Sequence, residues 1–441
     1  MDIQTWKSKN IGVKGYAHFD RRVSIDQVWN YITTPQNIVH HGFYPFIHYQ
    51  KHFNKYSKQN GIKTKERELC YSAHIDRCIF QYYSFLLNQK YNKRVEADGF
   101  SDSAVAYRDN LKKNNIHFAK QAVDFIKNQK ECYIIVGDFT HFFDSLDHKY
   151  LKKQLCDLLN CKKLPEDYYA IFKNITKYSM WDLKSLLELN SLPDTPEGIK
   201  ALNDKERVLP LHQFKAIKSK YITPHREMYG IPQGSAISAV LSNIYMLEFD
   251  KKMRQYVDSQ YGLYMRYSDD FIVVLPQSSK DNFSLQLSYI QHIIKSISNL
   301  DLQPEKTQLF YYSNFILENC NTDFLGNVQK GKNLLNYLGF TFDGKNITIR
   351  DKTLSKYYYR MYRKIRTIVK NNGYTPKGNK INCTKLYLKY SEKGAQKGNG
   401  NFLTYVHRAE FIFGKNEAIA RGTRHHMQKI RKHLDLIKNH V

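Results

Sequence analysis

The sequence lacks several features that would place it in familiar classes of protein. It has no apolar run long enough to cross a bilayer, and one of the longest, Phe271–Pro276, is far too short. Residues 1–15 carry lysines but no apolar segment of the kind that directs secretion. The 7 cysteines form no C-x-x-C pair, which disfavours a zinc site or a disulfide framework. These absences predict a cytoplasmic protein with reduced thiols and no membrane partner.

Acidic residues are scarce relative to basic ones. The chain has 68 Lys and Arg against 41 Asp and Glu, which gives a formal net charge of +27. The basic excess grows towards the C-terminus instead of being evenly mixed. A basic surface attracts polyanions and releases their counterions, so the charge points to a nucleic-acid partner. With 441 residues, 42% of them hydrophobic, the chain is long enough for two or three folded lobes.

The chain divides by composition into three regions. Residues 1–60 are rich in Tyr, His and Phe, have weak periodicity and form an N-terminal extension. Residues 61–350 form the next region, with a charged and irregular insertion at about 178–222 that contains several prolines. Residues 351–441 are basic and are predicted to be helical.

Hydrophobic periodicity predicts two helices outside the basic tail. Arg67–Tyr91 carries Ile75 and Ile79 at helical spacing, and Ser238–Met253 has a similar apolar face. A further helix is expected after Asp147, which is a suitable N-cap.

Two strand patterns end in acidic residues. The wholly apolar run Tyr133–Val136 precedes Gly137 and Asp138, as expected for a buried strand that delivers an acid at its end. Residues 264–275 read as two strands joined by a turn that contains Ser268, Asp269 and Asp270.

Acids arranged in this way suit a pair of divalent cations. Two hard cations roughly 3.5–4 Å apart need carboxylate oxygens from several elements, and without a cation clustered acids would repel one another. Taken singly, an Asp-Asp pair in a turn is usually turn chemistry. Asp144 is expected to order local structure rather than to bind metal. In combination, Asp138, Asp269 and Asp270 predict a site for two Mg²⁺ ions, with Mn²⁺ as the alternative.

Three blocks of this sequence resemble the palm motifs of reverse transcriptases. They are Asp138–Asp144, Gly230–Ser235 and Tyr267–Asp270, and the likeness extends over roughly residues 60 to 345. The resemblance implies an α+β, right-hand polymerase fold. Residues 61–350 would form the fingers and a palm of antiparallel sheet plus helices, and residues 351–441 a helical thumb.

The resemblance also implies roles for individual residues. Asp138, Asp269 and Asp270 would be catalytic metal ligands, with Phe139 part of the metal site and Lys306 a general acid for pyrophosphate. The predicted nucleotide-binding residues are Lys63, Lys65, Arg67, Phe143, Gln233 and Gly234. The predicted primer- and template-binding residues are Tyr267, Tyr337, Leu338 and Gly339. Phe143 would be a steric gate against the 2′-hydroxyl, which favours DNA synthesis over RNA synthesis.

These features predict an RNA-directed DNA polymerase that uses dNTPs, makes a DNA product and copies a structured noncoding RNA template. Oligomerisation is left open. Phe100–Arg108 resembles the corresponding block of prokaryotic abortive-infection and defence-associated reverse transcriptases, which implies an antiphage role. A retron enzyme is disfavoured because Asn-Ala-x-x-His and Val-Thr-Gly elements are missing, and a group II intron-like enzyme because the tail is short. Template-independent or protein-primed DNA synthesis remains an alternative, and a nonenzymatic RNA-binding scaffold is disfavoured by the intact acids.

Overall fold

The computed structural model describes residues 2–57, 61–276, 279–326, 330–371, 383–415 and 418–438. The chain divides into two compact units, each discontinuous in sequence. Unit 1 comprises residues 1–112, 138–255 and 288–303, and unit 2 comprises residues 113–137, 256–287 and 304–441. These units are defined by contacts between residues, whereas the division predicted from the sequence cuts the chain at residues 60 and 350. The predicted division therefore stays a prediction.

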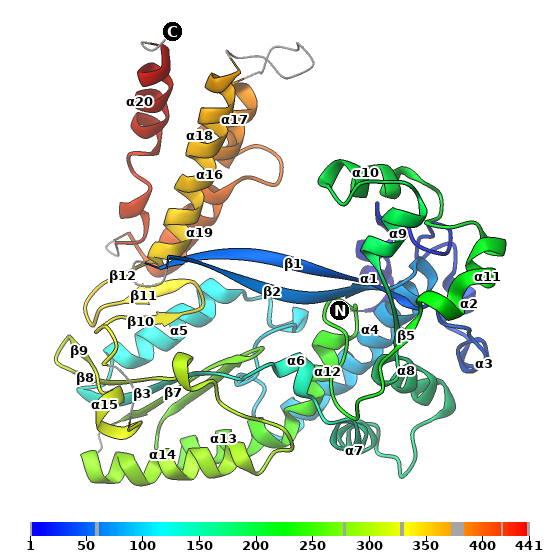
Figure 1. Cartoon of the computed structure of the whole chain (residues 1–441). Helices are drawn as coiled ribbons and strands as arrows, with labels where there is room; N and C mark the ends of the chain where they lie inside the picture. The colour runs from blue at the N-terminus through cyan, green and yellow to red at the C-terminus, as the bar shows by residue number, and fades with distance from the viewer. Residues whose placement is uncertain are drawn as a thin grey trace. The chain divides into compact units, whose positions relative to one another are not determined.

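Unit 1 is mainly helical and carries one sheet whose strands follow the order β2-β1-β4-β5 (Figure 1). Its helices are α1 (Ile3–Asn10), α2 (Trp29–Ile32), α3 (Pro35–Val39), α4 (His74–Ala97), η1 (Asp109–Leu111), α6 (Phe142–Ser145), α7 (His148–Leu159), α8 (Glu166–Thr176), α9 (Leu183–Leu189), α10 (Pro196–Asp204), α11 (Leu211–Tyr221) and α12 (Ser238–Tyr245). Its strands are β1 (Phe46–Ser57), β2 (Gly61–Tyr71), β4 (Ser179–Asp182) and β5 (Thr223–Pro224).

The long antiparallel pair β1–β2 corrects the expected helix over Arg67–Tyr91. The register runs from Ile47 opposite Tyr71 to Ser57 opposite Gly61. The helix α4 begins only at His74, where the Asp20 carboxylate accepts hydrogen bonds from the first backbone N–H groups. Charged and polar residues occupy successive positions of β2, so the strand lacks the apolar alternation that identifies a half-buried strand.

Residues 178–222 are also more regular than the sequence suggested. They form β4, the helices α9, α10 and α11, and the short strand β5. Trp181, Leu186 and Leu202 are buried there together with Phe19 and Phe214. The expectation of an irregular segment is therefore wrong, because apolar residues spaced between prolines and charges build a core of their own.

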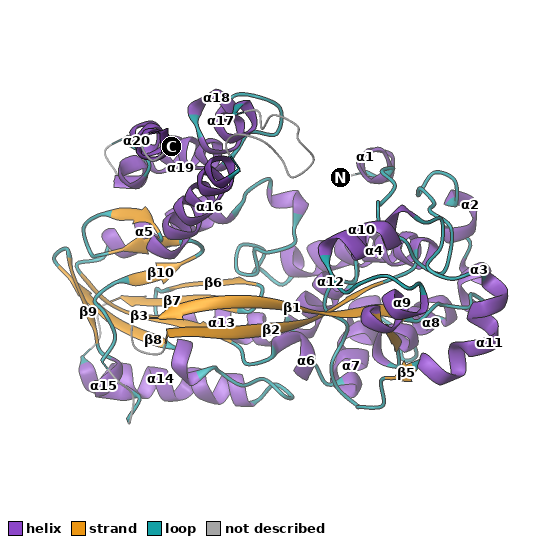
Figure 2. Cartoon of the chain, turned by 45° about the horizontal axis from the view of Figure 1, so that its top comes forward, coloured by secondary structure: helices purple, strands orange, loops and turns teal. Residues whose placement is uncertain are grey.

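Unit 2 contains a sheet in the order β6-β7-β3-β8-β9 (Figure 2) and a second sheet in the order β10-β11-β12 (Figure 1). Its strands are β3 (Glu131–Asp138, the last residue of which is grouped with unit 1), β6 (Leu263–Tyr267), β7 (Asp270–Pro276), β8 (Gln308–Ser313), β9 (Ile316–Asn319), β10 (Leu335–Tyr337), β11 (Phe340–Phe342) and β12 (Ile347–Ile349). Its helices are α5 (Asn115–Lys127), η2 (Pro304–Lys306), α15 (Asn321–Phe324), α16 (Asp351–Lys370), α17 (Thr384–Tyr390), α18 (Glu392–Ala395), α19 (Phe402–Phe413), η3 (Ala418–Gly422) and α20 (His426–Lys438). The helices α13 (Leu247–Ser259) and α14 (Lys280–Lys295) each run from one unit into the other.

Several expectations about the strands and helices are confirmed. β3 is buried along almost its whole length, as its apolar run predicts. β6 and β7 form the expected hairpin. The Asp147 side chain accepts the Tyr150 backbone N–H and so caps α7. The single helix expected over Ser238–Met253 is instead the two helices α12 and α13.

The basic C-terminal region is helical, as predicted. One face of α16 buries Tyr357, Met361, Ile365 and Ile368, at helical spacing. This face packs in a cluster with residues of α17, α19 and α20, including Ile430 (Figure 1). Within the described residues, none of the helices combines the length and the hydropathy that crossing a bilayer requires. The mixture of helices with antiparallel sheets confirms the α+β class.

Candidate active site

Asp138 stands at the end of β3, on a backbone that is fixed from outside the strand. Asp138 as a whole residue is only 8% exposed. The Asp138 carbonyl accepts the Gln303 N–H at 2.8 Å, and the next peptide units are held to Asp301 and Leu302. The ring of Phe139 is buried and has no ligand atom, so the predicted contribution of this residue to a metal site would have to come from its backbone carbonyl. The strand end is therefore a rigid support for an acid.

Asp269 and Asp270 lie at the connection of the β6–β7 hairpin in unit 2. Tyr267 pairs with Asp270, which leaves Ser268 and Asp269 as a two-residue loop. Ser268 has a φ of 64°, the left-handed value required at the first central position of a type II′ turn. The buried Arg266 donates from Nη1 to the Ser268 carbonyl at 2.8 Å. Ser268 is therefore a strained residue that its surroundings hold in place. In this turn Asp269 is half-buried and Asp270 is exposed.

The strand order relates the predicted acids within one sheet. β3, which ends at Asp138, is the hydrogen-bonded neighbour of β7, which begins at Asp270. The donor set suits Mg²⁺ in kind, because carboxylate oxygens are the ligands that hard cations prefer. Over the described residues, no group of three or more His, Cys, Asp or Glu side chains is already arranged to hold a metal ion. Shared coordination by Asp138, Asp269 and Asp270 therefore stays a prediction.

Within unit 1, the structure brings the block after Asp138 together with the loop 230–235. Gln233 donates from Nε2 to the two carboxylate oxygens of Asp144, at 3.0 and 3.1 Å. The Ile231 N–H donates to the Phe143 carbonyl at 2.9 Å. Two predicted nucleotide-binding residues, Phe143 and Gln233, thus belong to one hydrogen-bonded assembly. Asp144 therefore bonds to a residue 89 positions away, and its expected role in ordering local structure rather than binding metal stays a prediction.

Two glycines make this close approach feasible. Gly230 has a φ of 85°, and a Cβ there would lie 2.9 Å from the Asp144 carbonyl oxygen. Gly234 has a φ of 107°, and a Cβ there would lie 2.5 Å from the Cys70 carbonyl oxygen. Either side chain would force the backbone apart. The Cys70 N–H donates to the Gln233 carbonyl at 2.8 Å, so the loop is tied to the end of β2.

His148 is a supporting residue that the sequence did not reveal. It is buried in α7, and its Nε2 donates to the Gly230 carbonyl at 2.7 Å. Burial lowers the pKa of His148, which favours the neutral ring. An isolated histidine after a helix cap carries no recognisable motif, because its partner is 82 residues away in the sequence.

The predicted basic residues lie on β2. Lys63, Lys65 and Arg67 occupy alternate positions of the strand. Arg67 is exposed, with its guanidinium 5.6 Å from the centre of the Phe53 ring. The side chains of Lys63 and Lys65 lie outside the described part of the structure.

The predicted primer-contacting segment is a tight hairpin in unit 2. Leu338 and Gly339 connect β10 and β11 with φ values of 47° and 94°, as in a type I′ turn. Asn115 donates from Nδ2 to the Leu338 carbonyl at 2.9 Å. The Tyr337 ring is buried, and burial followed by the charge of Asp270 raises its pKa. Tyr337 thus supports the turn from the core, and primer contact at the turn itself stays a prediction.

Lys306 ends the short helix η2 and is exposed. It belongs to unit 2, as do Tyr267 and Asp270. Its role as a general acid is not tested by this position and stays a prediction.

Three features point to one class of protein: the acid at the end of β3, the acidic β6–β7 hairpin and the loop 230–235, called here the Gln-Gly loop after Gln233 and Gly234. This class is the nucleic-acid polymerases with a palm-type site. A family model described as reverse transcriptase (RNA-dependent DNA polymerase) matches residues 86–342. That match covers more than half of the sequence, and the chain belongs to this family. The α+β polymerase fold expected from the sequence is thereby confirmed.

Solved telomerase structures from Candida tropicalis share a distant structural likeness with the chain. The apo enzyme truncated from its C-terminal domain has 14% identity and a TM-score of 0.41, over 75% of this chain and 61% of that one. The apo telomerase has 13% identity and a TM-score of 0.40, over 97% and 68%. The complex with the TWJ fragment of telomeric RNA has 13% identity and a TM-score of 0.40, over 95% and 59%.

At these scores the likeness carries no argument about function, and the chain spans 61% of the first of these structures. No curated protein sequence matches the chain.

Replacing Asp144 with Ala is expected to raise the KM for dNTP roughly fivefold with little change in kcat. The reason is that Gln233 would lose a hydrogen-bond acceptor worth about 1 kcal/mol. Steady-state incorporation kinetics measure both constants, and Asp144→Asn, which keeps one acceptor oxygen, is the matched control. An unchanged KM in Asp144→Ala would contradict a positioning role for this contact.

Proposed function

We propose that the protein is an RNA-directed DNA polymerase that joins deoxynucleotides to a primer 3′-hydroxyl. The observation that carries the proposal is the strained, anchored hairpin that presents Asp269 and Asp270 beside the strand ending at Asp138 in the sheet order. The hairpin and Asp138 both lie within residues 86–342, the part matched by the reverse transcriptase family. The basic net charge of +27 supports a polyanionic template and product.

In this proposal the three acids Asp138, Asp269 and Asp270 hold two Mg²⁺ ions. When bound, these ions lower the pKa of the attacking hydroxyl and neutralise the pyrophosphate that leaves. Gln233 and Gly234 orient the nucleotide, and Lys306 gives a proton to the leaving pyrophosphate.

The basic strand β2 has a separate part in the proposal. Lys63, Lys65 and Arg67 hold the triphosphate through fixed positive charge.

Replacing Asp269 and Asp270 together with Ala is expected to reduce dNTP incorporation below detection. RNA binding should remain close to that of the wild type, since phosphates are bound by lysines and arginines. Primer extension and equilibrium RNA binding measure the two effects. Sequencing of copurifying RNA should recover the same molecules from both proteins.

The matched control is Asp194→Ala with Glu197→Ala, which removes one exposed acid just before α10 and one in its first turn. That control should keep its activity. Continued synthesis by the Asp269→Ala, Asp270→Ala variant would remove these residues from the active site.

Phe143 is proposed to exclude the ribose 2′-hydroxyl by its bulk. Replacing it with Val is expected to lower the preference for dNTP over NTP by roughly tenfold or more, a change of about 1.4 kcal/mol in discrimination. The ratio of kcat/KM for the two nucleotides measures the effect. Phe143→Tyr keeps the ring and should keep the preference, and equal selectivity in Phe143→Val and the wild type would exclude a gate at this position.

We propose further that the template is a structured noncoding RNA and that the biological role is antiphage defence. The support is the resemblance of Phe100–Arg108 to the corresponding block of defence-associated reverse transcriptases. The described geometry neither adds to this assignment nor depends on it.

One observation favours protein-primed synthesis as a second candidate function. The Tyr31 hydroxyl lies 2.9 Å from His41 Nδ1, and His41 Nε2 lies 2.7 Å from Asp76 Oδ1. Asp76 is buried, whereas Tyr31 is half-buried. A hydroxyl, an imidazole and a carboxylate in this order can activate a nucleophile. Burial, followed by the charge of Asp76, raises the pKa of Tyr31, so the hydroxyl needs a general base to become a nucleophile. In this candidate mechanism the proton passes to His41 as the oxygen attacks the α-phosphorus of a dNTP and pyrophosphate leaves.

Replacing Tyr31 with Phe is then expected to abolish covalent labelling of the protein by a radioactive dNTP, because only the nucleophilic oxygen is removed. Extension of a supplied primer should be unaffected. Tyr169→Phe, at an exposed tyrosine, is the control. Labelling that persists in Tyr31→Phe, or that never occurs in the wild type, would exclude this priming residue.

A further inference from the structure

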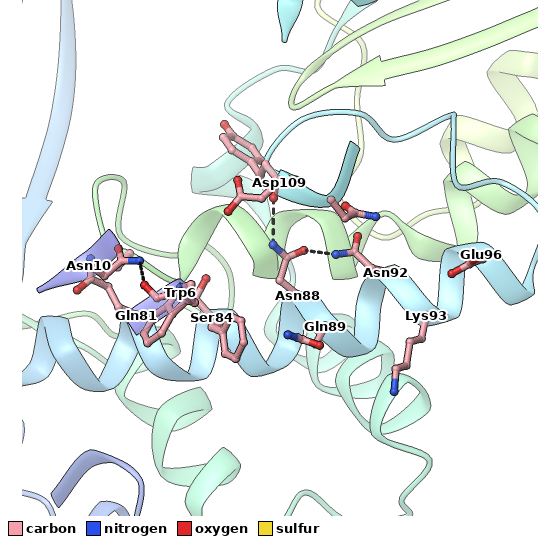
Figure 3. A pocket seen from close by; sticks show the side chains of 14 residues that line it. Trp6, Asn10, Gln81, Ser84, Asn88, Gln89, Asn92, Lys93, Glu96 and Asp109 are labelled. Atoms are coloured by element: carbon pink, nitrogen blue, oxygen red, sulfur yellow. Dashed lines mark hydrogen bonds between the residues drawn. The ribbon is translucent and has the colours of Figure 1, made fainter. Parts of the chain in front are cut away.

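A cavity of about 470 Å³ opens in unit 1, where α1 and α4 face the segment 107–110 (Figure 3). Its walls include Trp6, Gln81, Phe85, Asn88, Asn92 and Tyr107. Trp6 and Gln81 precede residue 86, where the family match begins, so part of the cavity lies outside the matched residues. Ala236 also lines it, directly after the Gln233–Ser235 loop. The cavity therefore adjoins the loop that the proposed function assigns to the nucleotide.

The carboxamides on one wall are held in defined orientations. The buried Arg108 donates from Nε to Asn92 Oδ1 at 2.7 Å. Asn92 Nδ2 donates to Asn88 Oδ1 at 3.4 Å, and Asn88 Nδ2 donates to the Tyr107 carbonyl at 3.2 Å. Each amide nitrogen has a second N–H beyond these bonds, and each amide oxygen a second lone pair. The wall thus offers fixed donors and acceptors side by side, as the edge of a nucleobase does.

Aromatic rings provide flat apolar surface in the same cavity. Trp6 and Phe85 pack with ring centroids 4.8 Å apart. Tyr107 is 45% exposed and has a φ of 63°, a conformation that a bulky residue adopts only where the surroundings impose it. An exposed aromatic residue held in a strained backbone beside polar amides is a suitable stacking platform for a base.

The charge of the lining argues against a phosphate as occupant. Lys93 is the cationic residue of the lining, against the two acids Glu96 and Asp109. The charged residues of the lining are thus more acidic than basic, although the whole chain has a net charge of +27. Such a lining does not favour binding of a negatively charged phosphate backbone. It suits an uncharged polar ring, with the attached sugar and phosphates left outside.

We propose that this cavity takes one unpaired nucleobase of a bound single-stranded RNA. The base stacks against Tyr107 and hydrogen-bonds through its edge to the amides of Asn88 and Asn92. The inference rests on the proposed function only in that RNA is a ligand of the protein. It adds a position at which the strand is read by contact with a base rather than by charge.

The test is equilibrium binding of single-stranded RNAs that carry one abasic site, moved along the strand. Divalent cations and dNTPs are omitted so that synthesis does not intervene. In the wild type, one abasic position should weaken binding about tenfold or more, the loss expected for one stacked base.

Tyr107→Gly should remove this dependence on position, since glycine accepts the backbone conformation without the ring. Asn88→Leu, which removes the polar edge, should do the same. Tyr261→Gly is the matched control, because Tyr261 is also exposed, at 87%, and has a φ of 55°, but does not line the cavity. The control should retain the dependence.

Equal binding of all abasic RNAs by the wild type would overturn the proposal, as would an unchanged profile in Tyr107→Gly. A flat abasic profile together with nucleoside binding that Tyr107→Gly abolishes would show that the cavity takes a free nucleotide instead of a base of the RNA, and would also overturn the proposal. Extension of a supplied primer by the wild type is measured separately. Normal extension with a flat abasic profile refutes only the base-binding cavity, whereas failed extension refutes the proposed polymerase function.

Discussion

The candidate site depends on holding two adjacent carboxylates at the end of a rigid hairpin. Like charges at neighbouring positions repel one another. The hairpin resists relaxation because Ser268 is fixed in a left-handed conformation and Arg266 anchors its carbonyl from the core. Strain of this kind costs of order 1–3 kcal/mol and persists only where the surroundings impose it. A divalent cation offsets the repulsion, so the same geometry that destabilises the free hairpin favours a metal-bound one.

The Gln-Gly loop, residues 230–235, imposes a second constraint, on the relative positions of the proposed nucleotide-binding residues. Gly234 packs against the Cys70 carbonyl, and Cys70 N–H bonds to Gln233, so the loop is joined to the strand that carries Arg67. On its other side Gln233 bonds to Asp144, which follows closely on Asp138. Residues proposed to hold the triphosphate, to orient the nucleotide and to contact its sugar are therefore linked to one another through backbone and side-chain hydrogen bonds. Any side chain larger than hydrogen at Gly230 or Gly234 would disturb all of them together.

The parts of this arrangement that the sequence predicted are local ones. β3 and the β6–β7 hairpin are short apolar runs that end in acids, and their patterns lie within a few residues. The contact between Asp144 and Gln233 spans 89 residues, and no local pattern encodes it. β2 was missed because its charged residues leave no apolar face to recognise, and residues 178–222 because their core residues are separated by prolines and charges. In each case the missing information was the identity of the distant partner.

Charge and shape divide the recognition of nucleic acid between different parts of the chain. A net charge of +27 attracts any polyanion, and counterion release makes that attraction fall steeply with salt. The amide-lined cavity contributes no such attraction, because its charged residues are one Lys and two acids. Stacking and edge hydrogen bonds act over short distances and are much less screened. At high salt the charge-driven binding weakens first. The share of the binding affinity that depends on the base in the cavity therefore increases. Salt dependence thus separates recognition of a base from nonspecific electrostatic binding of RNA.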